Sequence, residues 1–483
     1  MVIKISITLV GAGMGDPGCL TGEVREKINK ADMVFGAARL SAPFSDVRTQ
    51  KVVDTYRVND MIEALEGMIR CTENDSAEQI NGDVTDSTKQ INGDTKDHSV
   101  TAEIIINAVF IYSGDSGFYS GAEKAYLRLR EWTFSLKREH PEVQVDIDIM
   151  PGISSVSYLA ARLKVSWQDA EILSLHGRDF EETLPLVRDA VRYNDKTFVL
   201  LSGLEDVKKL VKNLKDFRDA EAFFGYRLSY EDEKLFRVGA GEGLPELQEG
   251  LYTVFIRNYA PRTKQLSYGI PTDEYLREEG VPITKEEIRE IVLSKLRLFK
   301  GCTFYDIGSG TGGVTIDAAG ISPDIKVFAI EKKADRVKLL RRNMDKFGLR
   351  NIYPVVGEAG EVLLAAGSDE VVNAGDQENK LQDETNIELM KKNPPDRVFI
   401  GGTEGRLRDI INLLRSYNRD IRVCMTAITV ETKNEIMKLL DEGTVSEPDI
   451  VEVSISRLAK LGGQHVMKKE NDIMVAAFNL TED

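Results

Sequence analysis

Two glycine-rich segments, far apart in the sequence, have the composition of turns that bring the backbone close to a ligand. The first is Gly11–Pro17 and the second is Asp306–Gly313. Glycine has no Cβ, so its backbone can approach a bound molecule and can adopt the positive φ angles that such turns need. The chemistry that this pattern supports is the binding of a nucleotide-like molecule at a strand-to-helix turn.

The second segment lies where a nucleotide-binding turn requires it, between an expected strand over 302–307 and an expected helix over 314–319. About twenty residues further on, a second apolar strand ends in Glu331, and a carboxylate at this place can accept both hydroxyl groups of a ribose. Asp306 at the end of the first strand favours S-adenosylmethionine (AdoMet) over a nicotinamide dinucleotide. The alternative is a tight turn that binds nothing.

The size and charge of the chain limit the classes of protein to consider. At 483 residues it exceeds a single ordinary core, so two or three domains are expected. The formal net charge of −16 argues against a nucleic acid or an anionic membrane as a partner, because clustered Lys and Arg recognise those surfaces. No apolar run approaches the length of a membrane span, and the apolar stretch 2–10 is predicted to be a core strand.

The cysteines are scattered along the chain, without the C-x-x-C spacing of a zinc site and without the pattern of a disulfide framework. They are Cys19, Cys71, Cys302 and Cys424. This usage predicts a protein of the reducing cytoplasm, and no metal site is predicted.

The elements that must position the first glycine segment alternate between strand and helix, which predicts an α/β fold with parallel strands. We predict a two-lobed domain over 1–258, with lobes over 1–112 and 113–258. The polar stretch 72–100 repeats the sequence Gln-Ile-Asn-Gly-Asp and lacks the apolar residues of a core. It is therefore predicted to be a surface insertion.

A second, Rossmann-like domain is expected over 259–483, after a linker that begins at Asn258. Thr284 followed by Glu287 has the spacing of a capping box, so a helix is predicted to begin there and to run to Leu298. A further acidic, polar insertion is expected over 366–394 within this domain.

Further motifs carry a resemblance to a known family over nearly the whole chain outside the two insertions. Through Gly11–Pro17, Ser113–Tyr119, Pro151–Ser155 and Ser174–Arg178, the first half resembles the class III tetrapyrrole methylases that methylate C5. The second half resembles their C15-methylating, decarboxylating partners through Gly269–Pro271, Ile283–Glu287, Asp306–Gly313, Ala329–Glu331, Phe399–Gly402 and Val430–Thr432. In this order, the two halves resemble the fused precorrin-6Y C5,15-methyltransferases (decarboxylating) of cobalamin biosynthesis.

The resemblance implies one AdoMet site in each domain. In the class III domain, AdoMet is expected in a cleft between the lobes, with Gly114, Asp115 and Phe118 on one side and Ser154 and Ser155 opposite. The first glycine segment is then expected to border the tetrapyrrole. Ser116 stands where the family commonly has proline, whose ring would fix φ, and this difference predicts a looser loop.

In the second domain, the resemblance implies that Asp306, Gly308, Ser309 and Gly310 surround the methionine part of AdoMet. Glu331 is expected on the ribose and Glu358 near the adenine, and Thr284 is a further expected cofactor contact. Many substrate carboxylates call for basic residues, and the expected contacts are His176 and Arg178 in the first domain and Arg457 and His465 in the second. No catalytic side chain is predicted, because alignment of the reactants can carry most of such a methyl transfer.

The resemblance implies a bifunctional enzyme that methylates C5 and C15 of precorrin-6B, or of its cobalt form, and removes the C12 acetate carboxylate as CO2. A homo-oligomer is expected from the resemblance alone. Two alternatives stay open: a methyltransferase that acts on protein or RNA, and a partly decayed AdoMet-binding sensor or scaffold.

Overall fold

The computed structural model describes residues 2–42, 51–82, 103–264, 269–279, 281–367, 380–417 and 420–480, except the side chains of 72–82 and 380. Its backbone forms two compact units. The first comprises Met1–Arg178 and Ala190–Arg262, and the second comprises Asp179–Asp189 and Thr263–Asp483. Both units are α/β, which confirms the predicted fold class.

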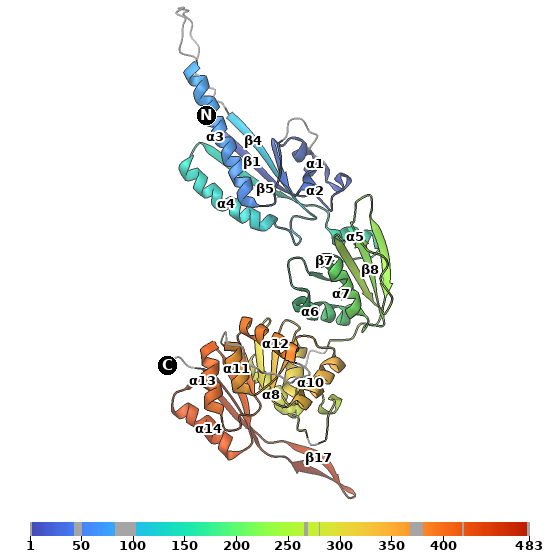
Figure 1. The fold of residues 1–483 in the computed structure, drawn as a ribbon, viewed down its shortest axis with the longest axis vertical. Helices are drawn as coiled ribbons and strands as arrows, with labels where there is room; N and C mark the ends of the chain where they lie inside the picture. Colours follow the sequence, from blue (N-terminus) through green and yellow to red (C-terminus); the bar gives the residue numbers. More distant parts are fainter. Residues whose placement is uncertain are drawn as a thin grey trace, which may run out of the picture. The chain divides into compact units, whose positions relative to one another are not determined.

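The first sheet of the first unit is parallel, with the strand order β3-β2-β4-β1-β5 (Figure 1). Alternate residues of β1, from Ile3 to Leu9, point to one face, where helices α3 and α4 cover them. Helix α1 packs on the other face through Val24 and Ile28. The elements are β1 (Val2–Gly11), η1 (Pro17–Cys19), α1 (Gly22–Asn29), β2 (Met33–Gly36), α2 (Ala38–Ser41), β3 (Lys51–Asp54), α3 (Val58–Gly82), β4 (Glu103–Tyr112), α4 (Ala122–Glu139) and β5 (Val143–Met150).

The predicted lobe boundary at 112–113 is wrong. Strand β5 pairs with β1 along its whole length, so it belongs to the first sheet, and the second sheet begins only after Met150. The physical reason is α4, whose apolar residues pack against this sheet and return the chain to it. The sequence prediction did not assign that helix, so the strand after it was placed in the wrong lobe.

The second sheet of this unit is mixed, with the order β6-β7-β10-β8-β9. β6 and β7 are parallel, whereas the other pairs are antiparallel. Helix α5 packs on it through Val156 and Leu159. The elements are α5 (Ser155–Leu163), β6 (Glu171–Ser174), β7 (Lys196–Leu201), α7 (Leu204–Leu214), β8 (Ala220–Tyr226), β9 (Lys234–Gly239) and β10 (Tyr252–Asn258). Helix α6 (Phe180–Tyr193) begins in the second unit and ends in the first.

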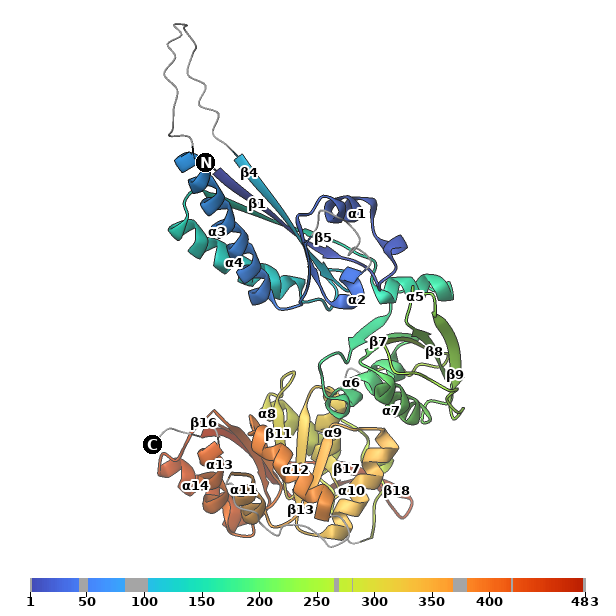
Figure 2. The ribbon, with the colours of Figure 1, turned by 45° about the horizontal axis from the view of Figure 1, so that its top comes forward.

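The second unit is a seven-stranded sheet in the order β13-β12-β11-β14-β15-β19-β16, with helices on both faces (Figure 2). Helices α8, α9 and α10 cover one face, and α11, α12, α13 and α14 cover the other. Its strands are β11 (Thr303–Ile307), β12 (Lys326–Glu331), β13 (Ile352–Val356), β14 (Arg397–Ile400), β15 (Arg422–Ala427), β16 (Val445–Val453) and β19 (Ile473–Leu480). Its helices are η3 (Thr272–Glu274), α8 (Glu286–Leu296), α9 (Gly313–Ile321), α10 (Ala334–Phe347), α11 (Ala359–Gly367), α12 (Lys380–Lys392), α13 (Leu407–Tyr417) and α14 (Val430–Asp441).

A separate two-stranded hairpin, β17 (Ser456–Leu461) and β18 (Gln464–Lys469), projects from the second unit (Figure 1). Three of its large apolar side chains are exposed, namely Leu458, Leu461 and Met467. Leu458 and Met467 are cross-strand partners in this hairpin, whereas Leu461 pairs with Gln464.

The two predicted insertions are only partly within the described residues. Helix α3 continues to Gly82, and 83–100 of the first insertion lie outside the described residues. In the second, 368–379 lie outside them, but α12 follows, and its Ile387 and Met390 are buried in the core. The acidic tract therefore ends in a core helix.

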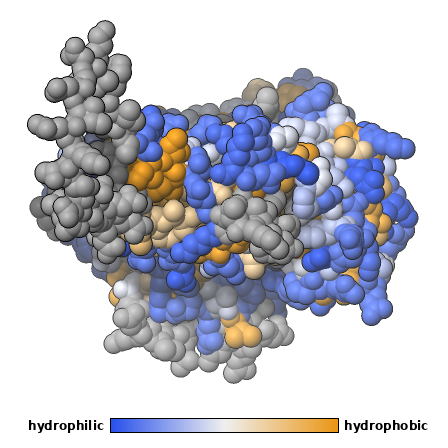
Figure 3. Space-filling model, turned by 90° about the horizontal axis from the view of Figure 1, so that it is seen from above, coloured by the Kyte–Doolittle hydropathy of each residue, from blue (hydrophilic) through white to orange (hydrophobic). Residues whose placement is uncertain are grey.

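The surface seen from above is mainly hydrophilic, with apolar side chains scattered between polar ones (Figure 3). Across the described ranges, no helix combines the length and the apolar character that crossing a bilayer requires.

Candidate functional site

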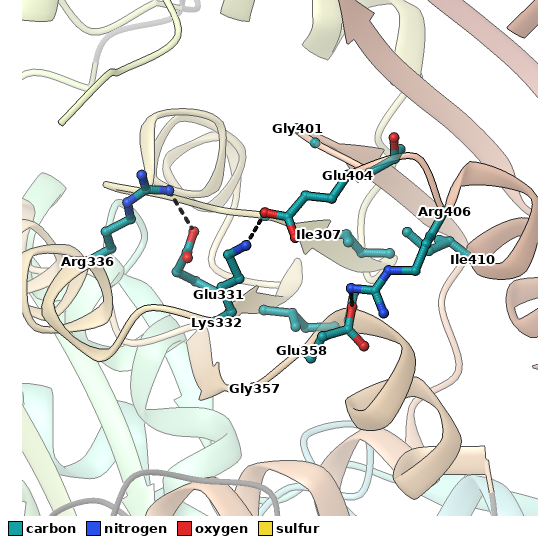
Figure 4. A pocket seen from close by; sticks show the side chains of 15 residues that line it. Ile307, Glu331, Lys332, Arg336, Gly357, Glu358, Gly401, Glu404, Arg406 and Ile410 are labelled. Atoms are coloured by element: carbon teal, nitrogen blue, oxygen red, sulfur yellow. Dashed lines mark hydrogen bonds and ion pairs between the residues drawn. The ribbon is translucent and has the colours of Figure 1, made fainter. Parts of the chain in front are cut away.

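The strand order of the second unit reverses between β11 and β14. The chain continues from β11 to β12 and β13 on one side, and β14 lies on the other side of β11. In open α/β sheets, ligands bind at such a point, outside the carboxyl ends of the strands. A pocket of about 150 Å³ lies there (Figure 4). The residues that end or follow the central strands line it, including Gly308, Glu331, Glu358 and Gly401.

Glu331 is the last residue of β12, and two backbone N–H groups hold its carboxylate. Gly310 N donates to Oε2 at 3.0 Å and Lys333 N donates to Oε1 at 2.9 Å, while an Arg336 Nη1 atom lies 3.6 Å from Oε2. The residue is only 3% exposed. Hydrogen bonds therefore link Glu331 to the glycine loop and hold its carboxylate at the wall of the pocket.

Asp306 on β11 is buried beneath the glycine loop. Thr315 Oγ1 donates to its Oδ2 at 2.5 Å, and burial raises the pKa of Asp306 to about 7. Its Oδ1 has no hydrogen-bond partner among the described residues, and the same holds for the buried hydroxyls of Ser309 and Thr311. Buried polar atoms are nearly always hydrogen-bonded, so each of these three atoms needs a partner from outside the described side chains, either an ordered water or a ligand.

Two ion pairs connect the loop after β14 to the opposite wall of the pocket. Lys332 contacts Glu404, and Arg406 Nη2 lies 2.7 Å from Glu358 Oε1 (Figure 4). Gly360 N also donates to Glu358 Oε2 at 3.0 Å. The pocket therefore carries three acids and three bases on its wall, and two of these pairs bridge it.

The structure brings only some of the predicted cofactor residues of this unit to the pocket. Gly308, Glu331 and Glu358 line it. The side chains of Asp306 and Ser309 are buried under the loop, and Gly310 contacts Glu331 through its backbone. Thr284 is outside the lining residues. The roles of all seven residues in AdoMet binding stay predictions.

The predicted capping box at Thr284 is wrong. Helix α8 begins at Glu286, its N-cap is Lys285, and no side chain caps it. The reason is that the completely buried Arg289 donates a hydrogen bond from Nη1 to the carbonyl oxygen of Thr284 at 2.5 Å. This carbonyl therefore does not accept the first hydrogen bond of the helix, as that of an N-cap residue would. The helix also ends at Leu296, two residues before the predicted end.

Arg289 is the centre of a buried polar cluster behind the glycine loop. Its Nε lies 2.6 Å from Asp317 Oδ2, and its guanidinium lies over the Tyr275 ring at 4.9 Å. The Tyr275 hydroxyl donates to Asp317 Oδ1 at 2.6 Å, and Arg289 also donates to the carbonyl of Ile270. The segment that precedes α8, with its Gly269–Pro271 motif, is thus fastened to helix α9.

In the first unit, three motif loops meet at the carboxyl ends of β1, β4 and β5. The backbones of Gly13 and Gly114 exchange two hydrogen bonds, with N–O distances of 3.1 and 2.6 Å. A Cβ on Gly152 would lie 2.4 Å from the carbonyl oxygens of Gly11 and Gly114. Only glycine fits between these backbones, so the first glycine segment is joined directly to the two loops that were predicted to hold AdoMet.

A cavity of about 570 Å³ lies beside these loops, between the two sheets of the first unit. The predicted residues Gly114, Phe118, Ser154, Ser155 and His176 all line it. Its volume is within the range of about 300–1,000 Å³ that small-molecule sites have. Sequence motifs that lie far apart in the chain therefore meet at one hollow of suitable size.

Asp115 does not line this cavity, because its carboxylate holds the loops together. Its Oδ1 accepts from Gly117 N and its Oδ2 accepts from Gly152 N, both at 2.9 Å. Ser116 is buried, and its hydroxyl donates to the carbonyl of Met150 at 2.9 Å. The expectation that Ser116 loosens the loop is therefore wrong, because the hydroxyl ties the loop to the end of β5.

The predicted substrate residues are separated by the structure. At the cavity wall, desolvation lowers the pKa of His176, an effect that Asp206 opposes and Arg39 adds to. Arg178 is not among the lining residues. Arg457 and His465 lie on the β17–β18 hairpin, outside the lining of the second pocket, and Arg457 contacts Glu287. Their roles stay predictions.

Sequence reasoning missed several charged residues and one tyrosine at the two sites. Arg39, Arg227 and Tyr230 line the first cavity, and Lys332 and Arg406 line the second pocket. Lys332 directly follows Glu331, and Arg406 directly follows the Gly401–Gly405 segment. Their position next to these residues could therefore have identified them as candidate site residues. Arg39 and Arg227 flank none of the motifs, and no local pattern marks them.

Two family models match the chain. Residues 6–242 match the model described as tetrapyrrole (corrin/porphyrin) methylases, and residues 274–379 match the model described as a precorrin methyltransferase domain.

Named relatives match the chain as well. A probable cobalt-precorrin-6B C(15)-methyltransferase (decarboxylating) from Sulfolobus acidocaldarius is 37% identical over 209 residues, which are 43% of this chain and 95% of that protein. The cobalt-precorrin-6B C(15)-methyltransferase (decarboxylating) of Salmonella typhimurium is 30% identical over 210 residues, with the same shares. A solved structure, named precorrin-6y C5,15-methyltransferase, from Geobacter metallireducens has 26% identity and a TM-score of 0.35. The match covers 44% of this chain and 97% of the chain in that structure.

Proposed function

Because the chain belongs to the family of cobalt-precorrin-6B C(15)-methyltransferases (decarboxylating), we propose that it completes two methylations of a precorrin in cobalamin biosynthesis. The unit that matches the tetrapyrrole methylases methylates C5. The other unit methylates C15 and releases the C12 acetate carboxylate as CO2. AdoMet is the methyl donor of such methyltransferases, and we propose one AdoMet site in each unit.

The observation that carries this proposal is the presence of two separate cavities, each built by glycine loops at the carboxyl ends of parallel strands. In the second unit, the unsatisfied Oδ1 of Asp306 and hydroxyls of Ser309 and Thr311 fit the amino and carboxylate groups of a methionine moiety. Glu331 fits the ribose hydroxyls, and Glu358 fits the neighbourhood of the adenine. In the first unit, Gly114, Phe118, Ser154 and Ser155 are the corresponding candidates.

AdoMet supplies an electrophilic methyl group on a positively charged sulfur. With AdoMet bound, an electron-rich ring carbon of the substrate would accept this methyl group, and the neutral thioether S-adenosylhomocysteine would be the leaving group. In the second reaction, the electrons of the breaking C–CO2 bond pass into the conjugated ring, and a proton from solvent then adds to the remaining CH2 carbon, so the acetate arm becomes a methyl group. The protein residues align the reactants and hold the substrate carboxylates, and such alignment is enough to account for much of the rate.

AdoMet binding to the second unit is expected to weaken as the pH falls through about 7. Burial raises the pKa of Asp306 to about 7, and only its ionised form attracts the ammonium group of methionine. The affinity should therefore be nearly constant above this pH and should fall by about tenfold for each pH unit well below it. Titration calorimetry of Asp306→Asn should show weaker binding with little pH dependence, and an equally flat profile for the natural chain would contradict the role of Asp306.

We further propose that the chain forms a homo-oligomer through the β17–β18 hairpin. Leu458 and Met467 are direct cross-strand partners and are exposed to 68% and 63%, so they form one apolar pair that the same pair of a second copy can cover. Leu458→Asp is expected to lower the mass measured by sedimentation equilibrium. Phe134→Asp, at an exposed apolar residue of α4 (66% exposed), is the control that should leave the mass unchanged. A monomeric natural chain would contradict the proposal.

The activity is tested by anaerobic incubation with AdoMet and either precorrin-6B or its cobalt form, followed by the mass of the product. The proposal predicts two added methyl groups and the loss of one CO2. AdoMet binding without any change in either tetrapyrrole would contradict it and would favour a protein or RNA substrate, or a binding protein without catalysis.

A further inference from the structure

We propose that Arg39 and Arg227, positioned by Tyr230, bind carboxylate arms of the tetrapyrrole in the cavity of the first unit. They would determine the specificity of this unit for polycarboxylate rings. The inference rests on the proposed C5 methylation and adds the residues that recognise the substrate.

The charge of the cavity wall favours an anionic ligand. Among the described residues that line the cavity, the charged side chains are Arg39 and Arg227, and none is Asp or Glu. The chain as a whole has a formal net charge of −16, with 79 acidic and 63 basic residues. A wall whose charged side chains are all positive contrasts with the acidic character of the chain, and it attracts anions into the cavity.

The two arginines meet at Tyr230. The Arg39 Nη1 atom lies 3.3 Å from the Tyr230 hydroxyl, and the Arg227 guanidinium lies 4.5 Å from the centre of the Tyr230 ring. Asp232 accepts from Arg227 Nε at 2.8 Å, so it fixes one edge of this guanidinium. Among the described residues, the Tyr230 hydroxyl is the hydrogen-bond partner of Arg39, and no acidic side chain there lies within ion-pair distance of it.

The first glycine segment holds Tyr230 in this position. Gly15 has φ +140°, and a Cβ built on it would lie 2.2 Å from the Tyr230 hydroxyl. Tyr230 therefore lies directly against the glycine backbone, and any other residue at position 15 would push it away. This contact gives the first glycine segment a role, because it seats the tyrosine that orients both arginines.

The turn between β8 and β9 carries further signs of a binding site. Arg227 and Ser229 have φ angles of +42° and +71°, which are unfavourable for residues with a side chain. Tyr119, with φ +49°, lines the same cavity. Residues held in such conformations gather at ligand clamps, where the rest of the structure enforces them.

The chemistry of the ligand follows from the guanidinium groups. Arginine offers parallel N–H donors that match both oxygens of a carboxylate, and the pairing is strongest away from bulk water. The rings of Phe118 and Tyr119, at 4.9 Å from each other, and the Tyr230 ring add apolar surface to the wall of the same cavity. A flat ring with carboxylate arms matches both kinds of surface.

The test compares Arg39→Gln, Arg227→Gln and the control Arg237→Gln in the full chain. Arg237 lies on β9, is exposed, pairs with Glu221 and does not line the cavity. Each of the first two variants is expected to raise KM of the precorrin for C5 methylation by about tenfold or more, with the affinity for AdoMet unchanged. Release of CO2, which reports on the second unit, should stay at the level of the natural chain in the same samples.

Two further variants separate charge from structure. Arg39→Lys keeps the charge but loses the paired donors, so it should recover only part of the lost affinity. Tyr230→Phe keeps the ring beside Arg227 but removes the partner of Arg39, and it should raise KM by about two- to fivefold.

The outcomes are distinguishable. If both glutamine variants methylate C5 with the KM of Arg237→Gln, the proposed role of Arg39 and Arg227 in binding the substrate is wrong, whereas the proposal that this unit methylates C5 is unaffected. If the natural chain binds AdoMet but never methylates C5, the proposed function of this unit is wrong, and the proposed role of Arg39 and Arg227 is wrong as well. If the glutamine variants lose both CO2 release and C5 methylation, the defect affects the whole chain. This result would also contradict a role of the two arginines that is limited to the first unit.

Discussion

Replacing Arg289 with alanine is expected to lower the free energy of unfolding of the second unit by about 3–5 kcal/mol. The side chain is completely buried, and its Nε lies 2.6 Å from Asp317. Without the guanidinium, the Asp317 carboxylate is left buried with the Tyr275 hydroxyl and the Ile270 N–H as its remaining partners. The carbonyl oxygens of Ile270 and Thr284 also lose their donor. Urea unfolding, followed by a probe specific to this unit, measures the change.

Arg342→Ala is the matched control for this experiment. Arg342 pairs with Glu278 at 3.2 Å, but the two side chains are 60% and 50% exposed. Exposed pairs contribute little, so this variant should change the free energy of unfolding by at most about 1 kcal/mol. Equal, small effects of both substitutions would contradict the assignment of Arg289 as the group that fastens the segment before α8.

Replacing Glu331 with alanine is expected to weaken AdoMet binding to the second unit by about 100-fold or more. The carboxylate accepts from the N–H groups of Gly310 and Lys333, so its loss frees the glycine loop as well as removing the proposed ribose partner. A hydrogen bond to a charged group contributes about 1.5–3 kcal/mol, and two such bonds account for an effect of this size. Calorimetric titration measures the affinity, and CO2 release should fall with it.

Glu361→Ala is the control for Glu331. Glu361 is an exposed acid on α11 in the same unit, and it is not among the residues that line the pocket. Its replacement should leave the affinity unchanged. A similar loss in both variants would mean that net charge, rather than the position of Glu331, determines binding.

The sequence predicted the features that depend on local pattern. Asp306 and Glu331 could be placed at the carboxyl edge of one sheet from local pattern alone. This pattern is an apolar strand, a glycine loop and a helix, followed by a second strand that ends in an acid. The facing of the Ser113–Tyr119 and Pro151–Ser155 loops was expected from the family resemblance and not from local pattern. These loops follow β4 and β5, which lie on either side of β1 in the sheet.

Features that depend on contacts between distant residues were not predictable. The capping box at Thr284 has the correct local spacing, but buried Arg289 takes the carbonyl of that residue and the helix begins two residues later. Arg39 and Tyr230 are 191 residues apart and come together only in the folded unit. The ion pair between Lys332 and Glu404 likewise joins two loops that no local pattern relates.

The lobe boundary failed for a different reason. The partner of the strand over 143–150 cannot be chosen from a strand pattern alone, because any parallel neighbour satisfies its backbone. The choice is made by α4, whose buried Leu129 and Trp132 pack with β1 and β5. An amphipathic pattern over 122–139 was the available signal, and it predicts a crossover back to the first sheet.

The measurement that tests the account most directly is the number of AdoMet molecules bound by one chain, determined by calorimetric titration of the natural chain and of Glu331→Ala. The account predicts two molecules for the natural chain and one for the variant at concentrations that saturate the first unit. One molecule for the natural chain and none for the variant would contradict it, because the first unit would then have no AdoMet site.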